Sequence, residues 1–454
     1  MIKKILLASL VLSQLAISCS SDNDDPTTEP EKELTLEEQI ANLAKQPYSK
    51  LTPAEQKIKL EAEANDMLVQ LDKSKSSSAI EALENLNRLL DVSSIDIFNG
   101  KNDNEVEDIL NVSGVYGVYT WDNAGKKWVK TASTTELKFV FPAKESQTAN
   151  NAIFSTKSTS SDIKVKYNDT YSWTENGSVE VNDYFFLPNT SDATLTIDSK
   201  EAAVISQTAK YANGKEVPNE FSYKMSVNDG YAWEMSGTKA TANVSKAALT
   251  YNGKNLISFN AGSSAEVDKL IDNDELVQYR GKANGLIQLM DNFVIVADMD
   301  LAELAKGETA AEASFPYPDR KTKTFYTDLN TYNKKTVEAS VANSNKNGKL
   351  ILVSKKDGTK IADIVYHAEA GYSFNSSEYE YWATDATDTK YGGKWVFDFN
   401  GGTPKGTAVK IQEYDSVLYL KFSDNTEVEM SAYFSEGFDK FEAKFEDFIA
   451  AFNK

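Results

Sequence analysis

The sequence almost lacks the residues on which most enzyme and metal sites depend. Its 454 residues include one cysteine, Cys19, and one histidine, His367. Ser-His-Asp triads, Cys-His dyads and the usual zinc sites each need residues that this chain lacks or has only once. A single cysteine also excludes a disulfide within the chain. The sequence therefore predicts no enzyme, no catalytic residues, no cofactor and no metal site, and we interpret His367 as a structural residue.

Basic residues are also scarce. The chain has 48 lysines and arginines against 68 aspartates and glutamates, a formal net charge of −20. An acidic surface of this kind repels the phosphate backbone of nucleic acids and anionic lipid head groups. We therefore expect no nucleic acid partner. Because 41% of the residues are hydrophobic and 11% aromatic, the chain can form a substantial globular core.

The apolar run at the start of the chain is too short to span a bilayer. Lys3 and Lys4 precede it, and it extends from Ile5 to Ile17, as in the h-region of a signal peptide. The residues that follow, Leu15-Ala16-Ile17-Ser18-Cys19, resemble the lipobox of bacterial lipoproteins, although alanine stands where leucine is usual. This resemblance implies that residues 1–18 are a lipoprotein signal peptide and that Cys19 is lipidated, so that its acyl chains anchor the protein in membrane lipid.

Residues 19–33 look like a tether. Between Cys19 and Glu33 there are six acidic residues, one lysine, two prolines and no large apolar side chain, so the segment cannot bury enough surface to fold. Acidic residues behind a lipidated cysteine are similar to the surface-export signal of Bacteroidota outer-membrane lipoproteins. That resemblance, which brings no catalytic residues, implies an outer-membrane protein exposed at the cell surface; a periplasm-facing protein is the alternative.

Helical periodicity occupies residues 34–98. Thr35 with Glu38 and Thr52 with Glu55 each form a capping-box pattern, and Pro53 suits the first turn of a helix. Apolar side chains then recur at spacings of three and four, which predicts short amphipathic helices.

The period changes to two in residues 99–454, which predicts half-buried antiparallel strands. Several Asn-Gly or Asp-Gly pairs favour tight hairpin turns, among them 176–177, 213–214, 229–230, 252–253, 347–348 and 357–358. A helical insertion is expected near 267–307, and phenylalanines at spacings of three and four predict a C-terminal helix at 437–453 that covers the sheet. The predicted fold class is α+β: N-terminal helices, then a large curved antiparallel sheet, built as a meander, with a covering C-terminal helix.

The densest aromatic cluster extends from Tyr372 to Phe399, interleaved with carboxylates. Flat aromatic faces beside carboxylates suit sugar rings, so the candidate ligand-binding residues are Tyr379, Tyr381, Trp382 and Trp395. Packing of these aromatic side chains within a sheet core is the alternative interpretation.

The sequence thus favours a membrane-anchored, non-catalytic binding or scaffolding protein that captures a glycan or a protein partner at the cell surface. Two alternatives stay open. A half-open sheet could carry lipid or another apolar ligand, and carboxylate pairs such as Glu378 and Glu380 could serve a hydrolase.

Overall fold

The computed structural model describes residues 34–93, 109–175, 177–273, 276–399 and 402–434. Cys19, the tether at 19–33 and the predicted C-terminal helix at 437–453 lie outside the described residues. Within the described part, the protein is of the α+β class: N-terminal helices pack against a large mixed sheet.

The N-terminal helices begin where the capping pattern predicts. They are α2 (Leu36–Ala44), α3 (Pro53–Asp72), the 3₁₀ turn η1 (Lys73–Ser76) and α4 (Ser78–Val92). The Thr35 hydroxyl accepts a hydrogen bond from the Glu38 backbone, and the Glu38 carboxylate accepts one from the Thr35 backbone. Thr52 and Glu55 form the same reciprocal pair at the start of α3. Both capping boxes are therefore confirmed.

Sixteen of the described strands form one sheet, in the order β18-β17-β14-β13-β12-β11-β10-β9-β8-β7-β6-β5-β4-β3-β1-β2, and β15 and β16 form a separate pair. The strands are β1 (Gly117–Asp122), β2 (Lys127–Thr131), β3 (Leu137–Phe141), β4 (Ala152–Thr174), β5 (Gly177–Ile197), β6 (Lys200–Lys210), β7 (Glu220–Val227), β8 (Tyr231–Thr238), β9 (Asn243–Tyr251), β10 (Lys254–Ser263), β11 (Lys282–Leu289), β12 (Phe293–Asp300), β13 (Gly348–Ser354), β14 (Thr359–Asn375), β15 (Glu380–Thr384), β16 (Gly393–Phe397), β17 (Lys410–Lys421) and β18 (Glu427–Glu429).

One pair of strands departs from the predicted antiparallel meander. β3 pairs with β1 in parallel, with Tyr119 opposite Phe139, whereas every other pair of neighbours recorded in this sheet is antiparallel. The two rings stack 5.3 Å apart, and both are buried. The parallel pair places these two large aromatic side chains on the same face of the sheet, where they join the core.

Most of the predicted tight turns are confirmed by backbone angles. Asn213, Asn252, Gly230 and Gly358 adopt positive φ where β6, β9, β7 and β13 turn into the next strand. The pair at 347–348 was predicted wrongly. Asn347 ends a helix there, and Gly348 has an extended backbone with a φ of −122° as β13 begins.

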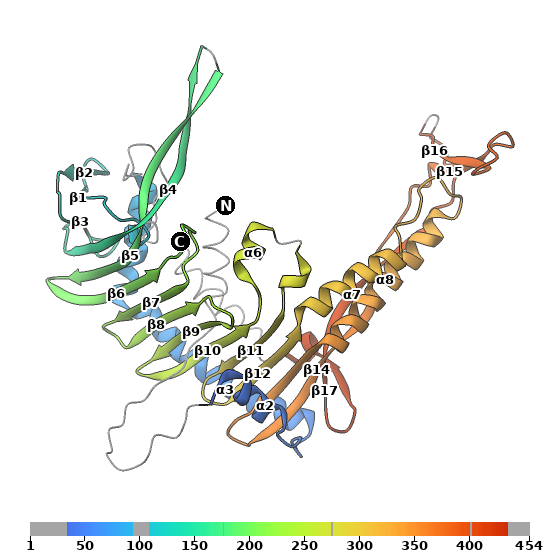
Figure 1. The fold of residues 1–454 in the computed structure, drawn as a ribbon, viewed down its shortest axis with the longest axis horizontal. Coiled ribbons are helices and arrows are strands. Elements are labelled where there is room, and N and C mark those ends of the chain that lie inside the picture. Colours follow the sequence, from blue (N-terminus) through green and yellow to red (C-terminus); the bar gives the residue numbers. More distant parts are fainter. Residues whose placement is uncertain (1–33, 94–108, 176, 274–275, 400–401, 435–454) are drawn as a thin grey trace.

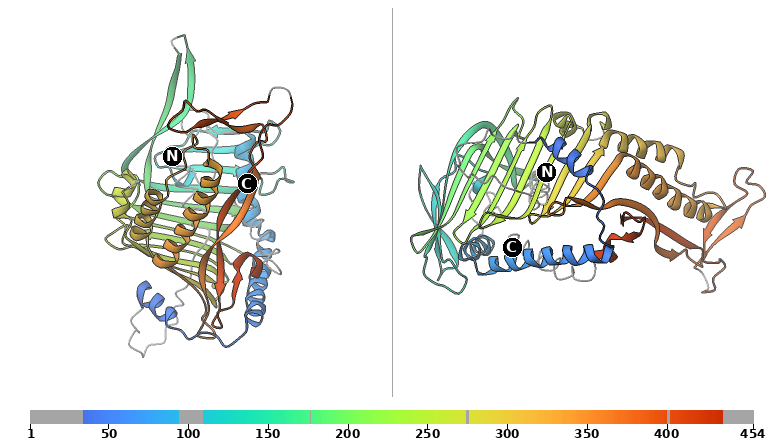
Figure 2. Two further views of the ribbon diagram at one scale, coloured as in Figure 1. Left: turned by 90° about the vertical axis from the view of Figure 1, so that its right-hand side faces the viewer. Right: turned by 90° about the horizontal axis from the view of Figure 1, so that it is seen from below.

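One face of the sheet is apolar. Helices α3 and α4 cover it and run one after the other across the strands (Figure 2). We call it the apolar face. The core on this face joins helix residues such as Met67, Leu86 and Leu90 to strand residues such as Phe139 and Leu195. On the opposite face, polar side chains alternate with these, as in the Lys224–Glu234 pair between β7 and β8, 2.5 Å apart.

The chain crosses from one face to the other between α2 and α3. Ile40 of α2 packs against Val294 and Val296, whose neighbour Phe293 points to the apolar face, where it meets Leu60 of α3. The crossing segment is held to the hairpin of β13 and β14 by backbone hydrogen bonds of 2.8 Å, from Ser49 to Lys360 and from Lys360 to residue 47. The helices therefore enclose β12 and β13 from both sides.

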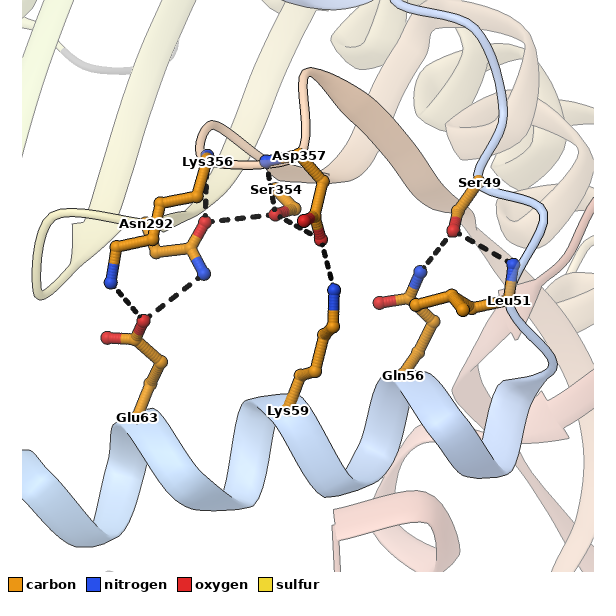
Figure 3. Close-up of polar contacts among 9 residues, drawn as sticks. All are labelled: Ser49, Leu51, Gln56, Lys59, Glu63, Asn292, Ser354, Lys356 and Asp357. Carbon is orange, nitrogen blue, oxygen red and sulfur yellow. Dashed lines mark hydrogen bonds and ion pairs between the residues drawn. The ribbon is translucent and has the colours of Figure 1, made fainter.

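A polar clamp fixes α3 to two hairpin turns of the sheet (Figure 3). The Asn292 side chain, which is buried, accepts hydrogen bonds from the Ser354 hydroxyl at 2.9 Å and the Lys356 backbone at 3.0 Å. Its amide donates to the Glu63 carboxylate at 3.2 Å. Asn292 thus joins three segments of the chain.

Replacing Asn292 by alanine is expected to lower the free energy of unfolding by about 2 kcal/mol, because the hydroxyl of buried Ser354 and the Lys356 amide both lose an acceptor. Urea denaturation measures the change. The variant Asp291→Ala, at the exposed neighbouring position, is the control and should change the free energy by less than about 0.5 kcal/mol. An equal effect of both substitutions would contradict the assignment of the clamp.

The same clamp predicts a pH dependence. Lys59 donates to Asp357 at 2.8 Å, and this hydrogen bond is the main cause that holds the pKa of Asp357 below its usual value. A lowered pKa stabilises the fold above the unfolded pKa, near 3.8, and the contribution is lost as pH falls through the folded value. We therefore expect Lys59→Met to be less stable than the wild type at pH 7, and the difference to shrink below pH 4. Urea denaturation at pH 7 and below pH 4 measures the difference in the free energy of unfolding between Lys59→Met and the wild type. A difference that is the same at both pH values would show that the pair contributes nothing.

An arm projects from one end of the sheet (Figure 1). Its helices, α7 (Leu301–Ser314) and α8 (Phe325–Asn347), are inserted between β12 and β13, and the outer parts of β14 and β17 run beside them. The helical insertion predicted near 267–307 corresponds to α6 (Val267–Asp272), η2 (Val277–Tyr279) and the start of α7, with β11 and β12 between them. The second helix of the arm, α8, has no counterpart in the prediction.

Candidate ligand-binding tip

Asparagine side chains of α8 hold the arm together. Asn345 bonds to the backbone N–H and C=O of Tyr366 in β14, at 2.9 and 2.8 Å. Asn330 bonds in the same way to β17, at Gln412 and Lys410, and the buried Asn333 donates to Gln412 at 3.0 Å. These amides satisfy strand backbone groups, so α8 is fixed along the strands and carries the end of the arm as one piece.

The end of the arm is the hairpin of β15 and β16. Trp382 and Trp395 lie opposite one another across its strands, with their rings edge to face and 5.7 Å apart. The indole N–H of Trp395 donates to the Thr322 carbonyl at 2.8 Å, and the Trp395 ring packs on Tyr326 at 5.1 Å. Trp395 is therefore mainly a packing residue that attaches the hairpin to the start of α8.

Arg320 is the centre of this attachment. Its guanidinium forms an ion pair with Glu380 and lies 4.6 Å from the ring centre of Phe325 and 5.6 Å from that of Trp395. The Tyr326 hydroxyl donates to the same carboxylate, and burial together with this hydrogen bond raises the pKa of Tyr326. A cation between aromatic rings and a carboxylate fixes β15 against α8 through charge-assisted and cation–π contacts.

The end of the arm also exposes aromatic rings. Phe397 is 63% exposed and Phe399 is 64% exposed, and half-buried Tyr379 lies between them, with ring distances of 6.5 and 4.7 Å. Tyr381 pairs with Val396 and so lies on the other face of the hairpin from Phe397. The Lys405 ammonium is 5.8 Å from the Tyr381 ring, and Lys405 pairs with Asp398 at 2.5 Å. We call this group the aromatic tip; it comprises Tyr379, Tyr381, Phe397, Phe399, Asp398 and Lys405.

The four sequence-predicted residues thus all lie on one hairpin, but in two groups. Trp382 and Trp395 pack against each other, whereas Tyr379 contacts the exposed rings of Phe397 and Phe399, and Tyr381 lies near the Lys405 ammonium. All four are half-buried. Prediction did not select Phe397 and Phe399. Their spacing of two after Trp395 placed them in strand-like alternation, but sequence alone could not say which alternating ring faces solvent.

The two carboxylates suggested as a hydrolase pair, Glu378 and Glu380, have different surroundings. Glu380 is engaged by Arg320 and Tyr326, while Glu378 is an exposed residue that precedes β15. His367 lies in β14, where its Nε2 is 2.8 Å from Glu427 and its ring is 4.5 Å from that of Tyr419. Within the part of the chain that the structure describes, no cluster of three or more histidines, cysteines or carboxylates is placed to hold a metal ion.

A second feature lies on the apolar face, at the ends of β9 to β12 away from α3. A hollow of about 290 Å³ is bordered by small residues, among them Ala261, Gly285 and Ala297, and by the larger Phe259 and Met299. Its border is almost wholly apolar, so it suits an apolar side chain or ligand.

Comparison with known proteins does not indicate a function for this chain. No family model, no curated protein and no solved structure matches the chain. Among the described helices, none combines the length and the apolar character needed to cross a membrane.

Proposed function

We propose that the protein is a lipid-anchored, exported binding protein without catalytic activity, and that it captures a neutral glycan at the cell surface through its aromatic tip. The observation that carries the proposal is the exposure of Phe397 and Phe399 at the end of a rigidly braced arm. Exposed aromatic rings that cluster at one place mark a candidate interaction site. The signal peptide 1–18, lipidation of Cys19 and the tether at 19–33 remain part of the proposal.

The shape of the tip favours a glycan over a small apolar molecule. The rings of Phe397 and Phe399 are exposed, and sugar rings can stack on such rings by their C–H faces. Asp398 and Lys405 stand beside Tyr381 and offer an acceptor and a donor for hydroxyl groups. The net charge of −20 disfavours acidic polysaccharides, which makes a neutral glycan the better ligand.

The arm also suits capture at a distance from the membrane. α8 has 23 residues, which corresponds to about 35 Å of helix. Residue 34, where the tether would join, lies beside α2, while β15 and β16 occupy the far end of the arm (Figure 1). A protein anchored through Cys19 would in this way present its tip outward.

A carrier of lipid or another apolar ligand is the second candidate function. The hollow beside Phe259 and Met299 favours it, because it combines apolar lining with room for part of an acyl chain. In this version of the proposal the sheet curves around its apolar face, and the helix predicted at 437–453 covers that face.

A binding screen distinguishes the two candidates. The protein lacking residues 1–33 is tested against immobilised neutral and acidic glycans, and its co-purified molecules are identified by native mass spectrometry. Binding of a neutral glycan without bound lipid supports the tip as the functional site. Bound lipid with no glycan signal supports the carrier, and silence in both assays contradicts both.

A further inference from the structure

In the clamp of α3, the Glu63 carboxylate bonds to both a lysine ammonium and an asparagine amide (Figure 3). The Asn292 side-chain amide donates to Glu63 Oε1 at 3.2 Å, and the Lys356 ammonium donates to the same oxygen. Asn292 lies in the turn between β11 and β12, and Lys356 lies in the turn between β13 and β14. The fold therefore brings an amine, an amide and a carboxylate together, although Glu63 and Lys356 are 293 residues apart in the sequence.

The carbonyl group of the same asparagine side chain is polarised by two donors. Asn292 Oδ1 accepts hydrogen bonds from the Ser354 hydroxyl at 2.9 Å and from the Lys356 backbone N–H at 3.0 Å. Two donors on one carbonyl oxygen stabilise the negative charge that develops there when a nucleophile attacks the carbon. The Asn292 side chain is thus prepared as an electrophile.

The electrophile is fixed, whereas the nucleophile can move. Asn292 and Ser354 are buried, and the Glu63 side chain is only 16% exposed, but the Lys356 side chain is 57% exposed. Lysine carries its nitrogen on a flexible four-carbon stem. Lys356 Nζ can therefore move from Glu63 Oε1 onto Asn292 Cγ while the asparagine stays in place.

We propose that Lys356 and Asn292 form an isopeptide bond within the chain, with Glu63 as the proton carrier. Glu63 accepts a proton from the Lys356 ammonium and releases it to water, and the neutral Nζ attacks Asn292 Cγ. Glu63 then carries a second proton from Nζ to Asn292 Nδ2. The Cγ–Nδ2 bond breaks, ammonia leaves, and a Cγ–Nζ amide bond remains.

The bond would close the part of the chain that carries the arm. Residues 292–356 include β12, α7, α8 and β13, so these two strands cannot separate from each other once the link has formed. A load on the arm is then borne by a covalent bond. The inference goes beyond glycan capture and does not depend on what the aromatic tip binds. The free-energy change predicted for Asn292→Ala refers to the protein before the bond forms.

The other lysine of the clamp does not have this arrangement. Lys59 bonds to Asp357 at 2.8 Å, and within the described part of the chain no further carboxylate bonds to both of these residues. No group is placed there to carry a proton from the amine to the leaving group. We therefore expect Lys59 and Asp357 to remain an ion pair.

Peptide mapping tests for the bond. The full-length protein is incubated at physiological temperature, denatured and digested with trypsin, and its peptides are identified by mass spectrometry. We expect a branched peptide that joins Asn292 to Lys356 and is lighter than its two parts by about 17 Da, the mass of ammonia. Fragmentation of this peptide distinguishes the bond from loss of ammonia at other asparagines. Absence of the branched peptide after prolonged incubation overturns the proposal.

Two substitutions test the assigned roles. Lys356→Arg keeps a cation beside Glu63 but removes the amine, so no branched peptide should form. Glu63→Gln removes the proton carrier and should lower the yield at least tenfold. The matched control, Lys355→Arg, changes the neighbouring lysine, which bonds to Gln288, and should leave the yield within about twofold of the wild type. A yield that Glu63→Gln leaves unchanged, or that falls equally in Lys355→Arg, overturns the proposal.

Discussion

Replacing Phe397 and Phe399 together by alanine is expected to weaken glycan binding about thirtyfold or more. Both rings are more than three-fifths exposed, and they flank Tyr379, so their loss removes most of the exposed aromatic surface of the aromatic tip. Residues that dominate a binding surface typically contribute 2 kcal/mol or more, which corresponds to roughly this factor. Titration of the protein on the glycan found in the screen measures the loss of affinity.

The control for this pair is Tyr372→Ala. Tyr372 is an aromatic residue of the same arm, is 72% exposed and stacks on Phe374 in β14, outside the hairpin of β15 and β16. Its replacement should leave the affinity within about twofold of the wild type. Because Phe397 and Phe399 are exposed, their replacement should leave the stability of the fold nearly unchanged. Equal losses of affinity at Tyr372 and at the tip would show that the glycan is bound elsewhere.

Replacing Arg320 by methionine is expected to have the second largest effect, at least tenfold weaker binding, through loss of positioning. Without the guanidinium, the Glu380 carboxylate keeps only the Tyr326 hydroxyl among its described side-chain partners, and the cation–π contacts with Phe325 and Trp395 disappear. Loss of a charge-assisted contact of this kind costs about 1 to 3 kcal/mol of local stability. The hairpin of β15 and β16 should therefore open more often.

Amide hydrogen exchange separates this positioning role from direct contact with ligand. In Arg320→Met, the amides of β15 and β16 should exchange at least fivefold faster, while those of β9 to β12 are unchanged. Lys321→Met removes the same charge at the neighbouring exposed position and should change neither exchange nor affinity. Weaker binding with unchanged exchange would instead make Arg320 a ligand contact.

The N-terminal helices could be predicted because their signals are local. Capping boxes at Thr35 and Thr52 act within one helical turn, and the apolar stripe from Leu60 to Leu71 needs only the helical period. The turn at 252–253 is equally local, because asparagine and glycine tolerate positive φ. In contrast, the parallel pair of β1 and β3 depends on where β3 docks in the sheet, which no local pattern encodes.

Helix α8 could not be predicted from apolar periodicity because it is held mainly through polar contacts. Asn330, Asn333 and Asn345 bond to the backbones of β14 and β17 instead of burying an apolar stripe. The same helix explains the wrong turn at 347–348, since Asn347 is its last residue. Long-range hydrogen bonds of this kind override the local preference of an Asn-Gly pair for a hairpin.

The sequence predicted which segment carries the candidate site, but it did not predict which of its side chains are exposed. The aromatic density between Tyr372 and Phe399 identified the segment, and the four chosen residues do lie on one hairpin. Arg320 and Tyr326, which are more than 50 residues earlier in the chain, contact Glu380 and Trp395 but leave Phe397, on the same face of the hairpin, exposed. Sequence spacing contains no information on that contact.

The most direct test of glycan capture by the aromatic tip is amide hydrogen exchange of the wild-type protein with and without the bound glycan. Binding at the tip predicts slower exchange confined to residues 378–399 and to the loop around Lys405, which precedes β17. Protection of β8 to β12, with no change at the tip, would contradict it.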